Sequence, residues 1–328
     1  MVSVNVDYSP DFLNEETRSD HLVSETMKKL WLVQLDMINK VTQVCDKYGI
    51  KYWAEGGTLL GAVRHGGYVP WDDDVDLLML REDYDKFLSI APKEFEYPYY
   101  IDSGYGMTSG LFTKIRRLDT IRYKSISGYI PTEERNAVVM FPPGICIDIF
   151  CADNCPNTHK EREELHNKLS EAYKKFIDAR KIYKCEYHNS YRPVDDFLKI
   201  KNHMIDSLNE YNELCKSYND KETDYIFNNA FPRYDIERGH MRYKEDYEDC
   251  VYLPFEMLTL RCPKGYERIL DMAYTQRQGV SWRTPMKNAA YHNQRGEPFF
   301  DFDNSFTKYT IPFYDKPEDL EKIPVKWK

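Results

Sequence analysis

Asp72, Asp73, Asp74 and Asp76 stand within five residues, and an apolar run follows them. Side chains alternate along a strand, so Asp74 and Asp76 are expected on one face with Val75 in the core. Two neighbouring carboxylates repel each other unless a cation lies between them or one is protonated. Mg²⁺ binds carboxylate and phosphate oxygens, so the pair predicts a metal–phosphate site. Asp72 and Asp73 fit a solvated turn equally well.

Asp148 is a third acidic candidate, because it is the one polar residue in the run Ile-Cys-Ile-Asp-Ile-Phe-Cys at 145–151. Burying an ionised carboxylate without a partner costs free energy of folding. A metal, the proton of an attacking hydroxyl, or an ion pair with Lys or Arg would relieve that cost. If Asp148 meets Asp74 and Asp76 in space, the three are the predicted catalytic and metal-binding residues, with Asp148 also able to accept a proton.

A glycine pair precedes the acids, between a short predicted strand and a predicted helix. Gly56 and Gly57, followed by Thr58, predict a tight turn that exposes backbone N–H groups where the helix begins, which is a favourable place for phosphate. We predict that these three residues contact the substrate.

Four basic residues complete the predicted substrate site. Arg64 and His65 lie just upstream of the acids and would meet donor phosphate. Lys114 and Arg116 lie two residues apart on a predicted strand, so they would share a face and stabilise the charge of the leaving nucleotide. The alternative for each is a surface ion pair. His65 fits a proton donor and a structural histidine equally well.

The pattern of the chain alternates between helix and strand. Helices are predicted at 22–48, 58–64, 82–90, 158–183, 195–218 and 264–274, and strands at 51–54, 72–80, 97–101, 111–118, 120–126, 145–151 and 252–261. Composition changes after Pro156. We therefore predict a catalytic core at 1–155 and a mainly helical region at 156–328 that packs on it.

Composition limits the class of protein. The 328 residues are 42% hydrophobic and 30% charged, as in globular proteins. The net charge of −9 argues against binding duplex nucleic acid, which needs a basic face. No signal-peptide pattern and no apolar run of about 18 residues is present. The expected location is the cytoplasm, with peripheral contact at the inner face of the membrane allowed.

These residues carry a resemblance to a known family. The run from Tyr52 to Asp76, YWAEGGTLLGAVRHGGYVPWDDDVD, resembles the signature of the LicD family, which includes bacterial phosphocholine transferases and is related to fukutin-related protein. The match continues through Met79–Tyr84, and weaker similarity follows at Lys114–Arg116, Leu253–Glu256 and Pro263–Tyr266. The resemblance implies the nucleotidyltransferase fold: an α+β structure with a mixed β-sheet flanked by helices, and a helical C-terminal part.

The resemblance also implies an activity. A phosphorylated small group, with phosphocholine from CDP-choline as the best-known case, would move from a CDP-linked donor to a hydroxyl of a glycan or glycolipid, as in modification of lipopolysaccharide, teichoic acid or capsule. Relatives transfer polyol phosphates. The implied cofactor is Mg²⁺, with Mn²⁺ as the alternative. Tyr68 and Trp71 would stack on a base, cover a quaternary ammonium or pack the loop.

Two other functions remain open at this point. One is a nucleotidyltransferase that activates a sugar or small molecule with an NTP and releases pyrophosphate. The other is a metal- or glycan-binding module without catalysis, against which the buried setting of Asp148 speaks. The sequence names neither the acceptor nor the number of metal ions.

Overall fold

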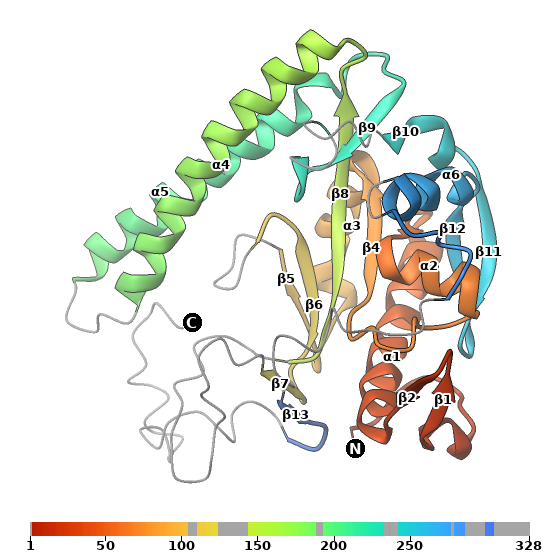
Figure 1. Ribbon diagram of the computed structural model, residues 1–328. Helices are drawn as coiled ribbons and strands as arrows, with labels where there is room; N and C mark the ends of the chain where they lie inside the picture. The colour runs from red at the N-terminus through yellow and green to blue at the C-terminus, as the bar shows by residue number, and fades with distance from the viewer. Residues whose placement is uncertain are drawn as a thin grey trace.

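The structure is a computed structural model that describes residues 2–103, 110–123, 144–187, 193–232, 236, 242–276, 279–285 and 299–304. Positions 124–126 of the strand predicted at 120–126, and 286–298 and 305–328 of the predicted C-terminal region, lie outside the described residues. The described residues form an α+β fold with a mixed sheet flanked by helices (Figure 1), which confirms the predicted fold class.

The elements follow the predicted order. The described α-helices are α1 (Glu25–Tyr48), α2 (Gly56–His65), α3 (Arg81–Glu94), α4 (His159–Tyr187), α5 (Val194–Cys215) and α6 (Tyr266–Leu270). The described strands are β1 (Glu16–Arg18), β2 (His21–Val23), β3 (Trp53–Ala54), β4 (Asp76–Leu80), β5 (Tyr99–Asp102), β6 (Thr113–Arg117), β7 (Ile121–Tyr123), β8 (Cys146–Cys155), β9 (Tyr225–Asn228), β10 (Arg242–Tyr243), β11 (Cys250–Phe255), β12 (Leu258–Pro263) and β13 (Phe299–Asp301).

The long strand β8 organises the seven-stranded sheet. It runs parallel to β4 along one side. On its other side, its first half pairs with antiparallel β6 and its second half with antiparallel β9. β5 continues the sheet from β6, β10 continues it from β9, and β3 pairs with the far edge of β4. Segments more than 70 residues apart thus meet on one strand.

The two faces of the sheet have different surroundings. Leu77 and Ile149 belong to the large core that α1 and α3 cover. Leu78 and Phe150 point to the opposite face and form a smaller cluster there. Asp148 lies two residues before Phe150, so its side chain is on this second face, where the apolar cluster ends.

Helix α1 agrees with the sequence pattern because both of its ends carry capping residues. The Ser24 hydroxyl accepts a hydrogen bond from the backbone N–H of Met27 at 3.3 Å, and Gly49 ends the helix with a φ of 62°. Between these caps, every residue from Leu30 to Ile38 is buried, so this part of the helix lies within the core on all sides.

The prediction of a single strand at 252–261 is wrong. The structure has a hairpin there, in which β11 and β12 pair antiparallel. The chain reverses at Glu256, a non-glycine residue with a φ of 53°. Arg18 donates to both carboxylate oxygens of Glu256, at 2.5 and 2.9 Å, and the Tyr68 backbone N–H donates to the same carboxylate at 3.0 Å. These bonds explain why Glu256 tolerates its unusual backbone.

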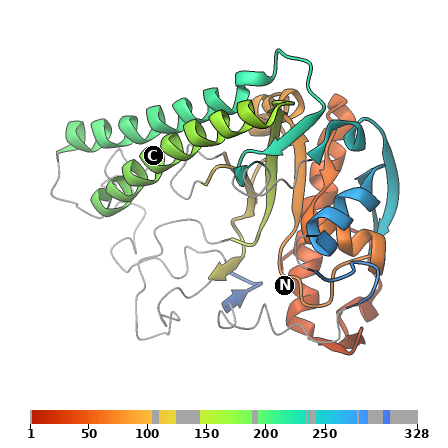
Figure 2. The same cartoon turned by 45° about the horizontal axis from the view of Figure 1, so that its top comes forward.

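The second half of the chain contributes to the sheet and extends away from it. β9 and β10 belong to the sheet, while α4 and α5 form an antiparallel pair that projects from it (Figures 1 and 2). Phe176, Met204 and Leu208 form part of the apolar contact between the two helices. No helix in the described ranges is long and apolar enough to span a bilayer. The division at residue 155 stays a prediction.

Replacing Asp153 by alanine is expected to lower the free energy of unfolding by about 3–5 kcal/mol. This buried residue of β8 accepts hydrogen bonds from Arg81 Nε at 2.8 Å and Nη2 at 2.6 Å, and the Arg81 side chain is only 13% exposed. The matched control is Asp85→Ala, because Asp85 pairs with the same guanidinium at 3.3 Å but is 52% exposed. Denaturant unfolding should show a loss below about 1 kcal/mol for the control; equal losses would contradict the prediction.

Candidate functional site

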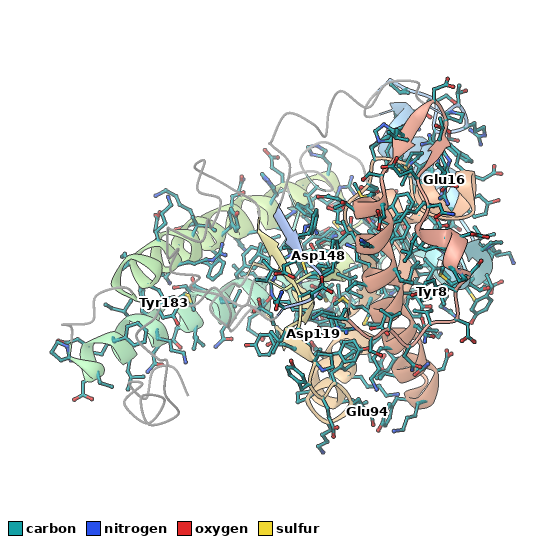
Figure 3. All side chains as sticks on the ribbon, turned by 90° about the horizontal axis from the view of Figure 1, so that it is seen from below. Tyr8, Glu16, Glu94, Asp119, Asp148 and Tyr183 are labelled. Carbon is teal, nitrogen blue, oxygen red and sulfur yellow. The ribbon has the colours of Figure 1, made fainter. Side chains whose placement is uncertain are left out.

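A row of charged residues crosses the second face of the sheet. Asp76 on β4 lies opposite Asp148 on β8, and Asp148 lies opposite Lys114 on β6. Residues opposite each other on adjacent strands point to the same face, about 5 Å apart. At the other end of the row, the backbone N–H of Glu55 donates to the Asp76 carbonyl at 3.0 Å. Figure 3 shows Asp148 inside the main body, away from Tyr183 on the projecting helix α4.

The segment before β4 carries the other acids. The structure corrects one detail, because β4 begins at Asp76 and Asp74 lies in the extended segment ahead of it. Val75 is buried, as predicted. Helix α1 holds the segment: Trp31 Nε1 donates to the Asp72 carbonyl at 2.8 Å, and Gln34 Nε2 donates to the Asp73 carbonyl at 3.0 Å.

Burial and mutual repulsion act on these carboxylates. Burial, followed by the negative charge of Asp74, raises the pKa of Asp72. Burial, followed by the charges of Asp74 and Asp148, raises the pKa of Asp76. Burial also raises the pKa of Asp148, although Lys114 opposes that rise. The acids predicted from the sequence therefore lie close enough to repel one another, and a positive charge among them would stabilise their ionised forms.

The two basic residues of β6 have different partners. Lys114 Nζ lies 2.5 Å from Asp148 Oδ1 and so belongs to the row. Arg116 Nε lies 3.3 Å from Asp102 Oδ2 on β5, and both side chains are buried. The structure thus brings Lys114 to the acids and pairs Arg116 with an acid at the neighbouring edge of the sheet.

The glycine turn lies against the acids. Gly56 has a φ of 52°, and a Cβ at that position would lie 3.3 Å from Asp76 Oδ2. A Cβ on Gly57 would come within 2.2 Å of Asp72 Oδ2, which a side chain could not do without displacing that carboxylate. Thr58 Oγ1 accepts a hydrogen bond from the Asp76 backbone N–H at 2.9 Å. Glycine at these positions lets the start of α2 approach the carboxylates.

Arg64 and His65 lie at the other end of α2. Eight residues of helix, about 12 Å, separate Arg64 from Gly56. Arg64 donates to the Trp282 carbonyl at 3.0 Å and to His65 Nε2 at 2.9 Å. Burial, together with the positive charge of Arg64, lowers the pKa of His65 to about 4, so its ring is neutral at pH 7. These contacts favour the structural interpretation of His65.

The two aromatic residues of the intervening loop pack within the fold. Tyr68 is buried and stacks on Trp31, with ring centroids 4.6 Å apart. Trp71 meets His21 edge-on, with centroids 5.8 Å apart. Loop packing therefore describes Tyr68 better than stacking on a base or covering a choline group.

The donor set suits Mg²⁺ in its chemistry, because hard cations take carboxylate oxygens and the repulsion among Asp74, Asp76 and Asp148 is what a divalent cation would offset. As positioned, no three His, Cys, Asp or Glu side chains in the described parts of the chain converge closely enough to hold a metal ion. The Lys114 ammonium supplies a positive charge at Asp148 instead. Metal binding stays a prediction.

Two residues near the acids were not predicted from the sequence. Tyr274, in the π-helical turn η5 (Asp271–Gln276), has its pKa raised by burial and then by the charges of Asp72 and Glu55. Arg122 on β7 binds Asp73. No spacing signal could have found Tyr274, because it lies some 200 residues downstream of the acids; Arg122 lies within the predicted strand at 120–126, and its basic side chain was the available clue.

The chain is similar in sequence to known proteins of one family. A model of the LicD/FKTN/FKRP nucleotidyltransferase domain matches residues 49–142. The chain is 26% identical to the lipopolysaccharide cholinephosphotransferase LicD of Haemophilus influenzae over 251 residues, which cover 76% of this chain and 90% of that protein. It is 56% identical to the human ribitol 5-phosphate transferase FKRP over 43 residues, 13% of this chain and 9% of that protein. An uncharacterized protein of Rickettsia typhi is 45% identical over 74 residues, 23% of each chain.

Proposed function

Because the chain belongs to the LicD family, we propose that it is a metal-dependent phosphotransferase that moves phosphocholine from CDP-choline onto a hydroxyl of a cell-surface glycan or its precursor. The observation that carries the proposal is the row formed by Asp76, Asp148 and Lys114 beside the glycine turn. The choice of phosphocholine follows the activity of the Haemophilus influenzae cholinephosphotransferase, which matches 76% of this chain. Ribitol phosphate is the second candidate, because a relative that is more similar over a short segment transfers it.

In the proposed reaction, the acceptor oxygen bonds to the phosphorus that carries choline. The bond from that phosphorus to the oxygen bridging the two phosphates breaks, and CMP departs. The acceptor proton passes to the Asp148 carboxylate, whose pKa is raised by burial and which is therefore a stronger base than an exposed aspartate. Lys114, which contacts Asp148, would offset charge on the departing nucleotide.

The remaining groups position the donor. The backbone N–H groups at the start of α2 would meet donor phosphate, and Gly56 and Gly57 let this helix start lie beside the carboxylates of Asp76 and Asp72. A bound Mg²⁺, held by Asp74, Asp76 and Asp148, would offset the charge of the donor diphosphate. A glycolipid acceptor would bring the protein to the inner face of the membrane.

A product assay tests the proposal. The purified protein is incubated with Mg²⁺, lipopolysaccharide and one donor at a time: CDP-choline, CDP-ribitol, CDP-glycerol or an NTP. We expect release of CMP from CDP-choline in step with choline appearing on the acceptor. Pyrophosphate from an NTP would instead identify a nucleotidyltransferase, and consumption of no donor with any acceptor would favour a binding module.

A further inference from the structure

A cavity of about 140 Å³ lies between α3 and α5, and the proposed reaction does not use it. Its wall includes Arg81, Tyr84 and Leu88 of α3, Leu208 of α5, and Asn229. An engineered protein cavity of about 150 Å³ takes up benzene, so this one has room for a small ligand or for part of a larger one. Asp85 and Lys216 also line the cavity and are partly exposed, so a ligand can enter from that side.

The cavity lies on the face of the sheet opposite the row of charged residues. The Tyr84 hydroxyl is 2.7 Å from Thr113 Oγ1, and Thr113 lies opposite Ile149 on β8. Because Ile149 directly follows Asp148 on that strand, the two side chains point to opposite faces. The cavity is also remote along β4: Asp76 begins this strand, and α3 starts at its other end, four residues or about 13 Å away. A ligand in the cavity is therefore held away from the acids.

Asn229 brings an unused amide to this cavity. The residue is 2% exposed, and its backbone is fixed by two hydrogen bonds: its N–H donates to the Cys151 carbonyl at 3.0 Å, and its carbonyl accepts from the Tyr211 hydroxyl at 2.6 Å. Its side-chain Oδ1 has no hydrogen-bond partner among the described residues. The large majority of buried side-chain polar atoms do have a partner, and for Asn229 the cavity is where one can bind. A hydroxyl satisfies either end of an amide, because it both donates and accepts.

The charged residues of the wall already have partners. Arg81 donates to Asp153 through Nε and Nη2, and to Asp85 through Nη1 at 3.3 Å. Lys216 Nζ donates to Glu213 at 3.1 Å. Since these acids balance the cations of the wall, the cavity does not favour an anionic ligand such as a phosphate.

The rest of the wall suits a neutral ligand that carries both hydroxyl and C–H groups. Leu88 and Leu208 offer apolar surface, and Asn229 offers its amide. Ligand sites commonly combine an apolar wall with a few polar groups that fix the orientation of the ligand. A short polyol, or a sugar ring inserted in part from the open side, has this chemistry.

We propose that this cavity binds one sugar or polyol unit of the acceptor glycan and so anchors the acceptor at a distance from the acids. This proposal rests on the proposed function, because that function supplies a glycan acceptor. A glycan has to be several units long to reach from the cavity to the acids, given their separation along β4 and across the sheet. The cavity therefore favours long acceptors over short ones.

Binding without any donor tests the cavity directly. Glycerol, ribitol, galactose and the oligosaccharide released from lipopolysaccharide are titrated onto the full chain, and binding is followed by ligand-observed NMR. Asn229→Leu keeps the branched shape of the side chain and removes its polar atoms, whereas Leu88→Trp fills the cavity. Each variant is expected to weaken binding of the compounds that the wild type binds by at least about ten-fold.

The matched control is Asn209→Leu, because it makes the same change at an exposed position of α5. It should bind sugars and polyols as the wild type does. Asn229→Leu should leave the thermal midpoint unlowered, since the side-chain oxygen that it removes has no hydrogen bond to another described residue. Leu88→Trp keeps Asn229 intact and so provides a second test if Asn229→Leu does not fold.

Transfer kinetics assign the bound unit to the acceptor. With CDP-choline as donor, Asn229→Leu is expected to raise KM for lipopolysaccharide about ten-fold and to change kcat little, because an anchoring contact acts equally on the bound and the reacting acceptor. With galactose as a short acceptor, wild type and variant should have the same KM.

The outcomes separate this proposal from the proposed function. Wild-type protein that binds none of these compounds, or that binds them no better than both variants do, overturns the proposal alone. An unchanged KM for lipopolysaccharide in both variants overturns the assignment to the acceptor. If the wild type consumes no donor, the proposed function fails, while binding that both variants lose still supports a sugar or polyol site in this cavity.

Discussion

Replacing Asp76 by asparagine is expected to reduce phosphocholine transfer by on the order of 10³-fold while raising the thermal midpoint of the metal-free protein. Asp76 lies opposite Asp148, and burial together with the charges of Asp74 and Asp148 raises its pKa. Its ionised form is therefore destabilised in the folded protein, and a neutral amide of the same shape removes that repulsion. Transfer and thermal unfolding are measured on the same preparations.

The control for Asp76→Asn is Asp85→Asn, because Asp85 is also an aspartate in an ion pair but is 52% exposed on α3. We expect it to leave both transfer and the thermal midpoint near wild-type values. Transfer that survives in Asp76→Asn would exclude this carboxylate from the reaction. A lowered thermal midpoint in Asp76→Asn would show that the ionised carboxylate of Asp76 stabilises the folded protein rather than destabilising it.

Local signals in the sequence predicted much of the fold. Helix α1 was predicted at 22–48 from its apolar period, which is a local feature, and the structure places it at Glu25–Tyr48. The hairpin at 250–263 was missed because its reversal uses Glu256, which is not a turn-forming residue. The contacts that hold Glu256 come from Arg18 and Tyr68, both almost 200 residues or more away in the sequence.

In the candidate site, too, local features could be predicted from the sequence and long-range contacts could not. The acids of the site could be predicted because Asp148 is conspicuous within an apolar run and Asp76 begins one. Strand register is a non-local property, and it alone puts Asp76, Asp148 and Lys114 in one row. Spacing on β6 made Lys114 and Arg116 equal candidates, but only the packing of β5 against β6 shows that Arg116 meets Asp102.

Mg²⁺ is expected to raise the thermal midpoint of the wild-type protein, and removal of divalent cations by EDTA is expected to abolish transfer. The folded-state pKa values of Asp72, Asp76 and Asp148 are raised above the ordinary aspartate value of 3.8. Each group therefore contributes stability that is fully present below its unfolded pKa of 3.8 and is lost as the pH rises through its folded pKa. The metal-free protein should lose this contribution on going from acidic to neutral pH.

A divalent cation that binds the ionised carboxylates reverses that loss, so the shift caused by Mg²⁺ should grow with pH. At a free concentration 100 times the dissociation constant, binding stabilises the folded protein by about 2.7 kcal/mol. Differential scanning fluorimetry across this pH range, with Mg²⁺ or with EDTA, measures the effect. The Asp74→Asn/Asp76→Asn double variant is the control, because it keeps the fold and lacks two of the three predicted ligands. An equal Mg²⁺ shift in this variant would place the bound cation elsewhere on the protein. Full transfer in EDTA would leave Lys114 as the group that offsets the charge of the donor.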